Sequence, residues 1–471
     1  MPSRPRRLSA IPAVETLLQR AELAAVLGRV SRLVVVESVR AVLARERARL
    51  ALPGAVAATA EALASAAAAE AETLATPGLR RVLNATGVVL HTNLGRAPLA
   101  PAAQAAVAAV ASGYCSLEYD LASGRRGERG AGVERWLTRL TGAEAALCVN
   151  NGAAALLLVL SALAAGRRVL VSRGELVEIG GSFRIPEILQ KSGATLVEVG
   201  TTNRTHLRDY ERALEGAADV AVLLRVHPSN FRIEGFTARP GLAELAALAR
   251  KRRVALVEDL GSGALVDLAP LGLGHEPTVG ESLAAGCDVV TCSGDKLLGG
   301  SQAGLILGKR KWLAKVRRDP IARAVRLDKL TLAALEATLP LYADPGQALR
   351  EVPTLAMLRL SPEDLEPRAR RLAEALAARV PGLRAAVVAG QGEVGGGALP
   401  LQRLPGWVVE VEQQGRDAPE LERRARAAEP PVIGTIRSGR WRLDPRTLTV
   451  AELEEVVEVL ARAFAPDGAW C

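Results

Sequence analysis

The stretch VVTCSGDKLLGGSQAG, residues 289–304, joins a short β-branched run to a lone lysine, Lys296, and a glycine-rich turn. Because β-branched residues favour strands and glycines favour tight turns, we expect Lys296 at the carboxyl end of a buried strand. A lysine held away from water has a lowered pKa, which favours attack of its neutral amine on a carbonyl group. Taken alone, Lys296 is equally well explained as a surface loop lysine. The other six lysines of the chain lie near helix ends or among charged residues, so Lys296 stands apart from them.

A second strand end lies upstream, in CVNNGAAALLL, residues 148–158. A short apolar strand is expected there, followed by a turn of Asn150, Asn151 and Gly152 and then by a helix. The first amides of a helix lack partners within the helix and attract anions, so this turn is a candidate phosphate site. Strand–glycine–helix turns are common, and the turn alone is a weak signal. Ser293, at the end of the later strand, is placed to add a contact to the same phosphate.

Two further strand ends carry polar residues. In VALVEDLGSG, residues 254–263, Asp259 follows a buried strand and precedes a glycine-rich turn. Its carboxylate can pair with a protonated ring nitrogen, although an N-cap or a solvated loop acid is the simpler interpretation. In RVHPSNFRIEG, residues 225–235, His227 or Ser229 could contact the oxygen of a bound ring, and a structural role in the turn is about equally well supported.

From residue 81 onward, short β-branched runs alternate with amphipathic helical stretches. Strands separated by helices indicate βαβ units and a mostly parallel sheet, in which ligands bind beyond the carboxyl ends of the strands. The expected strands are 168–172, 195–199, 220–226, 254–259, 289–293 and 303–307, and 242–251 is one of the expected helices.

The phosphate turn, Asp259 and Lys296 follow one another along the chain on successive units of this pattern. This combination resembles the fold-type-I pyridoxal-phosphate enzymes, which are α/β proteins. The resemblance implies pyridoxal 5′-phosphate as the cofactor, with Lys296 as its attachment point. It also implies that Asp259 keeps the cofactor ring protonated, so that the ring serves as an electron sink.

Shifts in sequence pattern predict three domains. Residues 1–75 are expected to form an N-terminal helical domain that includes the alanine-rich stretch 55–69. Residues 76–340 would then form the catalytic core, and residues 341–471 a smaller C-terminal α+β domain. Helices are expected in this last domain at 362–380 and 450–464, with strands at 407–412 and 440–444.

Composition excludes several classes of protein. The 471 residues are 49% hydrophobic and only 3% aromatic, which is a globular composition with a core of alanine, leucine and valine. Five widely spaced cysteines without a CxxC pair predict neither a metal site nor a disulfide framework, and they fit a reducing cytoplasm. The apolar run 153–166 is too short to span a bilayer, and no signal-peptide core follows the N-terminal charges, so no membrane association is expected.

Several longer strings extend the resemblance beyond the fold class. They are LNATGVVLHTNLGRAPL at 83–99, YDLASGRRGER at 119–129, RGELVEIGGSFRIP at 173–186, SGDKLLGGSQAG at 293–304 and DPIARAVRLDK at 319–329. Together they resemble the bacterial selenocysteine synthases, the L-seryl-tRNA(Sec) selenium transferases, over nearly the whole chain. The resemblance implies that Lys296 removes the α-proton of a seryl group carried by tRNA(Sec). Water then leaves, and selenium from selenophosphate adds to the β-carbon.

The family resemblance also implies residues for selenophosphate and a quaternary structure. Arg96, Arg323 and Arg326 match the family's arginines for selenophosphate, whose oxygens a guanidinium binds in pairs. Arg323 and Arg326 are three residues apart and would share one face of a helix. Each arginine, taken singly, could equally be part of a surface ion pair. A homo-oligomer is expected, with dimers assembled into a closed ring.

The N-terminal domain would bind tRNA, according to the resemblance. The net charge of the chain is +9, and residues 1–50 contain ten arginines against four glutamates. Phosphate contacts supply most of the nonspecific affinity for nucleic acid, so this concentration of charge agrees with an RNA partner, whereas no DNA partner is expected. A solvated helical face or an oligomer contact would carry the same charge. Residues 1–75 contain no aromatic residue, so base stacking is not expected there.

Two alternatives stay open. Relatives of the family act as lyases on small amino acids or amino sugars, but they often lack the N-terminal helical domain that residues 1–75 predict here. A tRNA-binding protein with an inactive site is disfavoured because Asp259 and Lys296 are both present. One departure concerns Thr435, which stands where relatives tend to carry arginine, so no C-terminal site residue is predicted.

Overall fold

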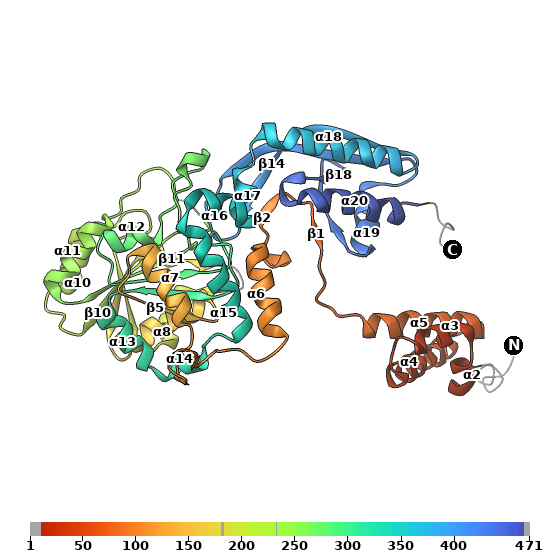
Figure 1. Ribbon diagram of the computed structural model, residues 1–471, viewed down its shortest axis with the longest axis horizontal. Helices are drawn as coiled ribbons and strands as arrows, with labels where there is room; N and C mark the ends of the chain where they lie inside the picture. The colour runs from red at the N-terminus through yellow and green to blue at the C-terminus, as the bar shows by residue number, and fades with distance from the viewer. Residues whose placement is uncertain (1–10, 180–182, 232, 466–471) are drawn as a thin grey trace. The chain divides into compact units, whose positions relative to one another are not determined.

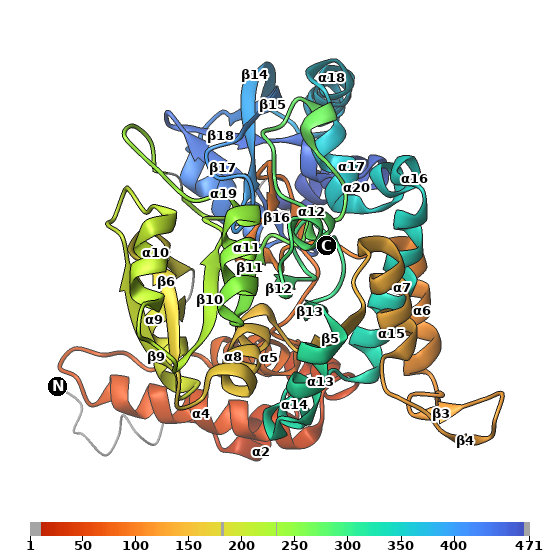
Figure 2. The same ribbon diagram turned by 90° about the vertical axis from the view of Figure 1, so that its left-hand side faces the viewer.

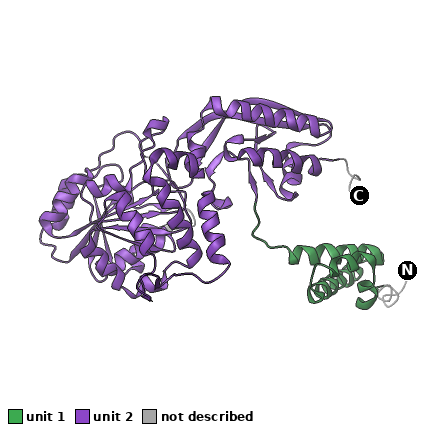
Figure 3. Ribbon diagram, in the orientation of Figure 1, with its two compact units in different colours: residues 1–81 green, residues 82–471 purple. Residues whose placement is uncertain are grey.

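The computed structural model describes residues 11–179, 183–231 and 233–465. The chain divides into two compact units, residues 1–81 and 82–471 (Figure 3). Arginines 4, 6 and 7, which contribute to the predicted basic N-terminus, lie outside the described residues. A division of the second unit near residue 340, as the sequence predicts, stays a prediction.

Unit 1 is helical between residues 11 and 75, as expected from the sequence. Its described helices are α2 (Val14–Leu18), α3 (Ala21–Leu27), α4 (Arg32–Leu50) and α5 (Ala60–Ala75). Ala64, Ala67 and Ala71 of α5 are fully buried and recur every three or four residues, so they form one face of the helix. That face packs with leucines and valines of the other helices, among them Leu43 and Val39 of α4.

The larger unit is built on a seven-stranded sheet with the strand order β5-β13-β12-β11-β10-β6-β9, whose strands are labelled in Figure 2. Only β13 runs antiparallel to its neighbours, which confirms the predicted mostly parallel sheet. The strands are β5 (Ala145–Val149), β6 (Arg168–Ser172), β9 (Thr195–Val199), β10 (Val220–Val226), β11 (Ala255–Gly261), β12 (Val289–Ser293) and β13 (Gly304–Gly308). Since the six others are parallel, their carboxyl ends meet along one edge of the sheet.

Both faces of this sheet are buried, so its strands are apolar without strict alternation. Val169 and Leu170, adjacent in β6, belong to two different core clusters, one on each face. Figures 1 and 2 show the helices that surround the sheet. One cluster contains α8 (Gly152–Ala164), α9 (Ile185–Lys191) and α13 (Arg310–Arg318); the other contains α7 (Ala131–Thr141), α10 (Leu207–Leu214), α11 (Leu242–Arg252), α12 (Val279–Ala284) and α15 (Lys329–Thr338).

A second, five-stranded sheet has the order β17-β18-β15-β14-β2. Its strands are β2 (Val88–Leu90), β14 (Leu383–Gly395), β15 (Arg403–Gln413), β17 (Thr435–Arg437) and β18 (Arg440–Leu443). The long β14–β15 hairpin packs against α18 (Pro362–Arg379). β2 pairs in parallel with β14, and β1 (Leu83–Asn84) pairs with β16 (Val432–Ile433), so the segment that follows unit 1 contributes to the sheet structure of the C-terminal region.

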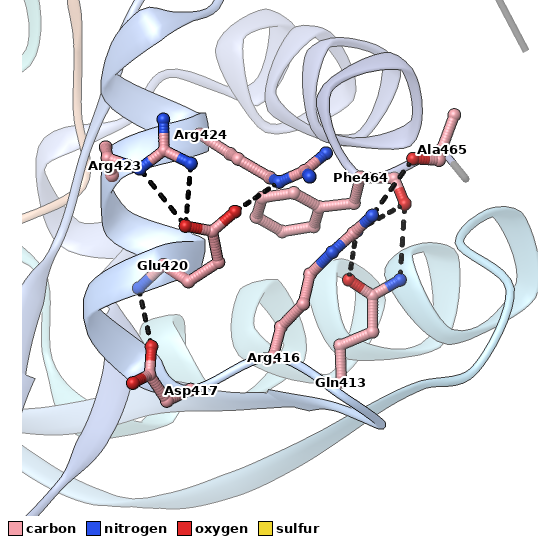
Figure 4. Close-up of polar contacts among 8 residues, drawn as sticks. All are labelled: Gln413, Arg416, Asp417, Glu420, Arg423, Arg424, Phe464 and Ala465. Carbon is pink, nitrogen blue, oxygen red and sulfur yellow. Dashed lines mark hydrogen bonds and ion pairs between the residues drawn. The ribbon is translucent and has the colours of Figure 1, made fainter. Parts of the chain in front are cut away.

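Polar contacts join the end of β15 to the last helix, α20 (Val450–Ala463) (Figure 4). Arg416 donates to the carbonyls of Phe464 and Ala465 at 2.7 and 3.1 Å, which satisfies carbonyls beyond the helix end. Asp417 caps the helix that follows, α19 (Ala418–Ala427), by accepting from the amide of Glu420 at 2.9 Å. These contacts hold the C-terminal helices on the sheet. Within the described residues, no helix is both long and apolar enough to cross a membrane.

Candidate active site

Lys296 lies in the turn after β12 and is only 7% exposed. The backbone surrounds its side chain closely: a Cβ placed on Gly397 would lie 2.7 Å from both Cε and Nζ of Lys296. A Cβ on Gly261, at the end of β11, would lie 3.8 Å from the same Nζ. Burial lowers the pKa of the Lys296 amine, and the charge of Arg96 acts in the same direction, while Asp259 opposes the shift. The structure therefore provides the desolvated amine that the sequence predicts.

Asp259 lies within β11, where it is paired across the sheet with Thr291 of β12. The hydroxyl of Thr291 donates to Oδ1 of Asp259 at 2.9 Å. Burial raises the pKa of Asp259, and the hydrogen bond from Thr291 and the charge of Lys296 act against this rise. A buried carboxyl in this position can share a proton with a cationic ring nitrogen. The sequence pattern predicts Asp259 just after the strand, whereas in the structure β11 continues to Gly261.

The predicted phosphate turn forms the start of α8. Asn151 is the N-cap, and its side chain accepts from the amide of Ala154 at 2.8 Å. A Cβ on Gly152 would lie 2.8 Å from Oγ of Ser293, so the two predicted residues adjoin and the glycine keeps the space between them open. The amide of Asn150 donates to the carbonyl of Val325 at 2.9 Å. First-turn amides and a neighbouring hydroxyl make a cradle that suits a phosphate group.

His227 follows β10, and its amide donates to the carbonyl of Asp259 at 2.9 Å. Nε2 of His227 lies 3.3 Å from Oε1 of Glu276, a residue that the sequence pattern does not single out. Ser229 is 1% exposed, and its Oγ has no hydrogen-bond partner within the described part of the chain. A Cβ on Gly261 would lie 3.1 Å from this hydroxyl, which places Ser229 beside the Lys296 amine.

These residues fit pyridoxal phosphate. The desolvated amine of Lys296 suits its carbonyl carbon, the buried carboxyl of Asp259 suits its ring nitrogen, and the start of α8 suits its phosphate. The buried hydroxyl of Ser229, without a partner within the described residues, marks a position where a ligand oxygen would complete the hydrogen bonding.

The three candidate arginines occupy two places in the unit. Arg96 has a left-handed backbone conformation, with φ of 62°, and forms an ion pair with Asp295 at 2.6 Å, next to Lys296. Arg323 and Arg326 instead line a cavity of about 300 Å³ that also contains Arg129.

The expectation that Arg323 and Arg326 share one helix is wrong. The helix α14 (Pro320–Ala324) ends before Arg326, which forms an isolated β-bridge with Val149. The pairing of Val149 with Arg326 occupies the backbone there, so the chain leaves the helix and follows the end of β5. Both side chains still line the same cavity, and the bridge places Arg326 directly beside the turn that begins at Asn150.

The structure adds a segment that sequence reasoning missed. A cavity of about 560 Å³ beside Ser229 is lined by residues 393–397 and 399–403 from the β14–β15 connection and by residues 90–93. Gly397, in a left-handed conformation with φ of 87°, leaves no room for a Cβ between its backbone and the Lys296 side chain. The run of three glycines at 395–397 is a signal for close backbone approach. Thr435, by contrast, lies in β17 opposite Arg442 and lines neither this cavity nor the one beside Arg323.

Unit 1 presents fewer unpaired cations than its composition suggests. Residues 11–81 contain nine arginines and seven glutamates, and several pair with one another, such as Arg45 with Glu70. Arg40 and Arg47 of α4 are exposed and form no ion pair within the described part of the chain. Because they are seven residues apart, they lie on one face of the helix.

Comparisons with known proteins show the family of the chain. The profile of the family described as "L-seryl-tRNA selenium transferase" matches residues 82–449, and a second one, "Selenocysteine synthase N terminal", matches residues 8–47. A protein of Geotalea uraniireducens named L-seryl-tRNA(Sec) selenium transferase is 50% identical over 462 residues, which cover 97% of this chain and 99% of that protein. A protein of the same name from Nitratidesulfovibrio vulgaris is 53% identical over 386 residues, 82% of either chain.

A solved structure of D-glucosaminate-6-phosphate ammonia-lyase is similar with a TM-score of 0.55 and 22% identity, and the match covers 83% of this chain and 97% of that one. At this identity the likeness concerns the fold alone. The predicted fold class, an α/β fold of type I with an N-terminal helical region, is confirmed. The resemblance drawn from the sequence strings is confirmed by the family match, and the chain belongs to the L-seryl-tRNA selenium transferase family.

Proposed function

We propose that this protein converts seryl-tRNA(Sec) to selenocysteinyl-tRNA(Sec), with pyridoxal phosphate as cofactor and selenophosphate as selenium donor. The observation that carries the proposal is the 50% identity to a named L-seryl-tRNA(Sec) selenium transferase across 97% of this chain. That match includes the N-terminal helical unit as well as the residues around Lys296.

The buried residues supply the proton transfers that this conversion needs. When bound, pyridoxal phosphate supplies an electron sink for charge that develops at the α-carbon of the seryl group. Nζ of Lys296 is neutral more readily than an exposed amine because burial lowers its pKa, so it can take the α-proton. Asp259, held by Thr291, is oriented to keep a ring nitrogen protonated. The start of α8 and Ser293 hold the phosphate group, and the backbone amide of His227 donates to the carbonyl of Asp259.

The arginines supply positive charge for selenophosphate. We assign this role to Arg96, beside Lys296, and to Arg323 and Arg326, which line a separate cavity together with Arg129. A guanidinium matches the oxygens of a phosphoryl group in pairs, which supports arginine over lysine at such a site. Arg96 already has Asp295 as a partner, so binding the anion would require it to exchange or share that contact.

Unit 1 is proposed as the tRNA-binding part. Arg40 and Arg47 are its exposed candidates for phosphate contacts, and each contact made to a phosphate adds to the salt dependence of binding. Replacing both by glutamine should weaken tRNA binding and make the salt dependence shallower. Lys251→Gln, at the exposed end of α11 in the other unit, is the control.

We also propose a homo-oligomer built from dimers, located in the cytoplasm. Large apolar side chains are exposed in the 114–121 segment, where Tyr114 is fully exposed and Leu121 is 79% exposed, and they suit a contact with another subunit. A mass measured by light scattering tests this, and a monomer at micromolar concentration would contradict it.

The test of function is a single-turnover assay of the aminoacyl group. The purified protein is incubated with seryl-tRNA(Sec), pyridoxal phosphate and selenophosphate, and the amino acid released from the tRNA is identified by mass spectrometry. We expect selenocysteine with the wild type and with Lys251→Ala, and none with Lys296→Ala. If the wild type binds the cofactor normally but yields no selenocysteine, the second candidate from the sequence, a lyase for a small amino acid or amino sugar, takes its place.

A further inference from the structure

Glu276 is a buried carboxylate outside the residues assigned so far. It lies just before α12, two residues from the N-cap Thr278, and is only 2% exposed. A carboxylate this deep in a protein needs partners, because removing its charge from water is costly. The hydroxyl of Ser262 contributes to holding the pKa of Glu276 down, and two further partners belong to the surroundings of Lys296.

The first partner of Glu276 is His227, whose Nε2 lies 3.3 Å from Oε1. Burial pushes the pKa of Glu276 upward, but the hydrogen bonds and charge of its neighbours outweigh burial, and the pKa lies below the ordinary value. Glu276 is therefore ionised at neutral pH. A carboxylate at one ring nitrogen determines which nitrogen carries the proton and how the imidazole is oriented.

The second partner is the backbone of the segment that covers Lys296. The amide of Leu399 donates to Oε2 of Glu276 at 3.3 Å. Leu399 and Leu401 both have positive φ angles, 47° and 68°, which are unfavourable for non-glycine residues and require support from contacts. Gly397, two residues before Leu399, is the residue that packs on the amine of Lys296.

The same segment separates two cavities. Leu399, Pro400 and Gln402 line both the cavity of about 560 Å³ beside Ser229 and a second one of about 490 Å³. Glu276 and His227 line only the second. Glu276 thus lies in the second cavity and contacts both the end of β10 and the 397–402 segment. These two elements lie near the cofactor lysine.

We infer that Glu276 is a positioning residue that orients the His227 imidazole and anchors the 397–402 segment over Lys296. The role of this positioning in catalysis rests on the proposed function. The contacts of Glu276 themselves can be tested in the cofactor-free protein. Replacing the carboxylate by an amide of the same size should loosen both partners while preserving the volume of the side chain. The variant for this test is Glu276→Gln.

The chain offers a matched control. Glu281 lies 3.8 Å from Nε2 of His275, also as a glutamate–histidine pair, but both side chains are more than half exposed. Solvent screens such a pair, so Glu281→Gln should leave its histidine and the cofactor site unchanged. Both variants lose one negative charge. Glu281 also accepts from the backbone amide of Thr278 at 2.7 Å, and the side-chain oxygen of glutamine can keep that capping bond, so Glu281→Gln leaves the start of α12 in place.

The first measurement follows each histidine in the cofactor-free protein. Diethyl pyrocarbonate acylates the imidazole, and the chain has only four histidines, so the acylation of each peptide can be followed over time by mass spectrometry at one fixed pH. We expect His227 to be acylated several-fold faster in Glu276→Gln and at the wild-type rate in Glu281→Gln, because only the first variant changes the buried carboxylate that lies against its Nε2. Glu258, Asp259, Arg239 and His275 also face this region and are unchanged in the variant.

The second measurement is the affinity for pyridoxal phosphate, followed by its visible absorbance. We expect at least tenfold weaker binding for Glu276→Gln and no change for Glu281→Gln. An unchanged acylation rate for His227 overturns the inference, whatever happens to the affinity, because a purely structural role would weaken binding without exposing this imidazole. If Glu276→Gln does not fold, Glu276→Asp, which keeps the charge and shortens the reach, must raise the acylation rate part of the way. A raised acylation rate in a protein that makes no selenocysteine would refute the proposed function and leave this inference intact.

Discussion

Replacing Gly397 by alanine should displace the side chain of the cofactor lysine, Lys296. The new Cβ would lie 2.7 Å from Cε and Nζ of Lys296, whereas carbon atoms in contact prefer about 3.5 Å or more. The end of a lysine side chain is the softest neighbour, so we expect it to move by about 0.8 Å rather than the backbone. Misplacement of a reacting group by about 1 Å can cost about a hundredfold in rate, and we expect a loss of that order in cofactor attachment.

The cost in stability comes from the backbone and can be measured separately. Gly397 has φ of 87°, and a left-handed conformation costs an L-residue about 1–2 kcal/mol. Gly382 has φ of 70°, and a Cβ placed on it would have no neighbouring atom within 4 Å, so Gly382→Ala carries the same backbone cost without a clash. Urea unfolding of the cofactor-free variants should therefore give similar losses for the two, within about 1 kcal/mol.

The assay is the rate at which visible absorbance appears when pyridoxal phosphate is added. Gly382→Ala should attach the cofactor at the wild-type rate, and Gly397→Ala about a hundredfold more slowly. An unchanged rate in Gly397→Ala would refute the reasoning, because it would mean that Lys296 does not pack on this glycine. If Gly397→Ala does not fold, the double variant with Lys296→Ala is measured instead. Lys296→Ala removes the clashing atoms, so the double variant should lose only as much stability as Gly382→Ala.

Three further predictions follow from single contacts. Asn151→Ala removes the cap that accepts from Ala154, and urea unfolding should show a loss of about 1 kcal/mol; no loss would mean that water replaces the cap. Thr291→Val removes the donor to Asp259 and raises the pKa of that carboxyl further. The cofactor-free protein should therefore lose about 1–3 kcal/mol of unfolding free energy at neutral pH. Little should be lost below pH 3.8, where the carboxyl is protonated in both the folded and the unfolded state. Burial lowers the pKa of the Lys296 amine, so between the lowered pKa and pH 10.5 the unfolded chain binds more protons than the folded one. Lys296→Met should therefore stabilise the cofactor-free protein near neutral pH by an amount that shrinks as the pH approaches 10.5. A stability difference that does not change with pH would argue against a buried amine.

Local sequence was sufficient for the central strands. The bounds of β6, β9, β10 and β12 agree with the runs at 168–172, 195–199, 220–226 and 289–293, because β-branched residues buried on both faces leave an unbroken apolar signal. It was insufficient for β14, whose sequence LRAAVVAGQGEVG is rich in alanine and glycine, residues with low strand propensity. That strand forms because β15 and β2 supply its hydrogen bonds.

Part of the candidate site could also be predicted from the sequence. Lys296, Asp259, Gly152 and Ser293 could be singled out because each lies at a recognisable strand end, and parallel strands bring their carboxyl ends to one edge. Glu276 could not, since it lies in an irregular segment whose position depends on packing. The arrangement of Arg323 and Arg326 was mispredicted for the same reason: a bridge to β5, distant in sequence, ends the helix between them.

The sequence by itself therefore determined the order of strands and helices, the family, and which residue types stand at the strand ends, since these depend on local pattern and composition. Only the tertiary structure decided which surfaces cover those residues. Gly397 comes to rest on Lys296 from about one hundred residues away, and Glu276 joins His227 to Leu399, through contacts between segments distant in sequence. Such contacts are set by burial and by the hydrogen bonds that buried polar groups must make, and no local pattern encodes them.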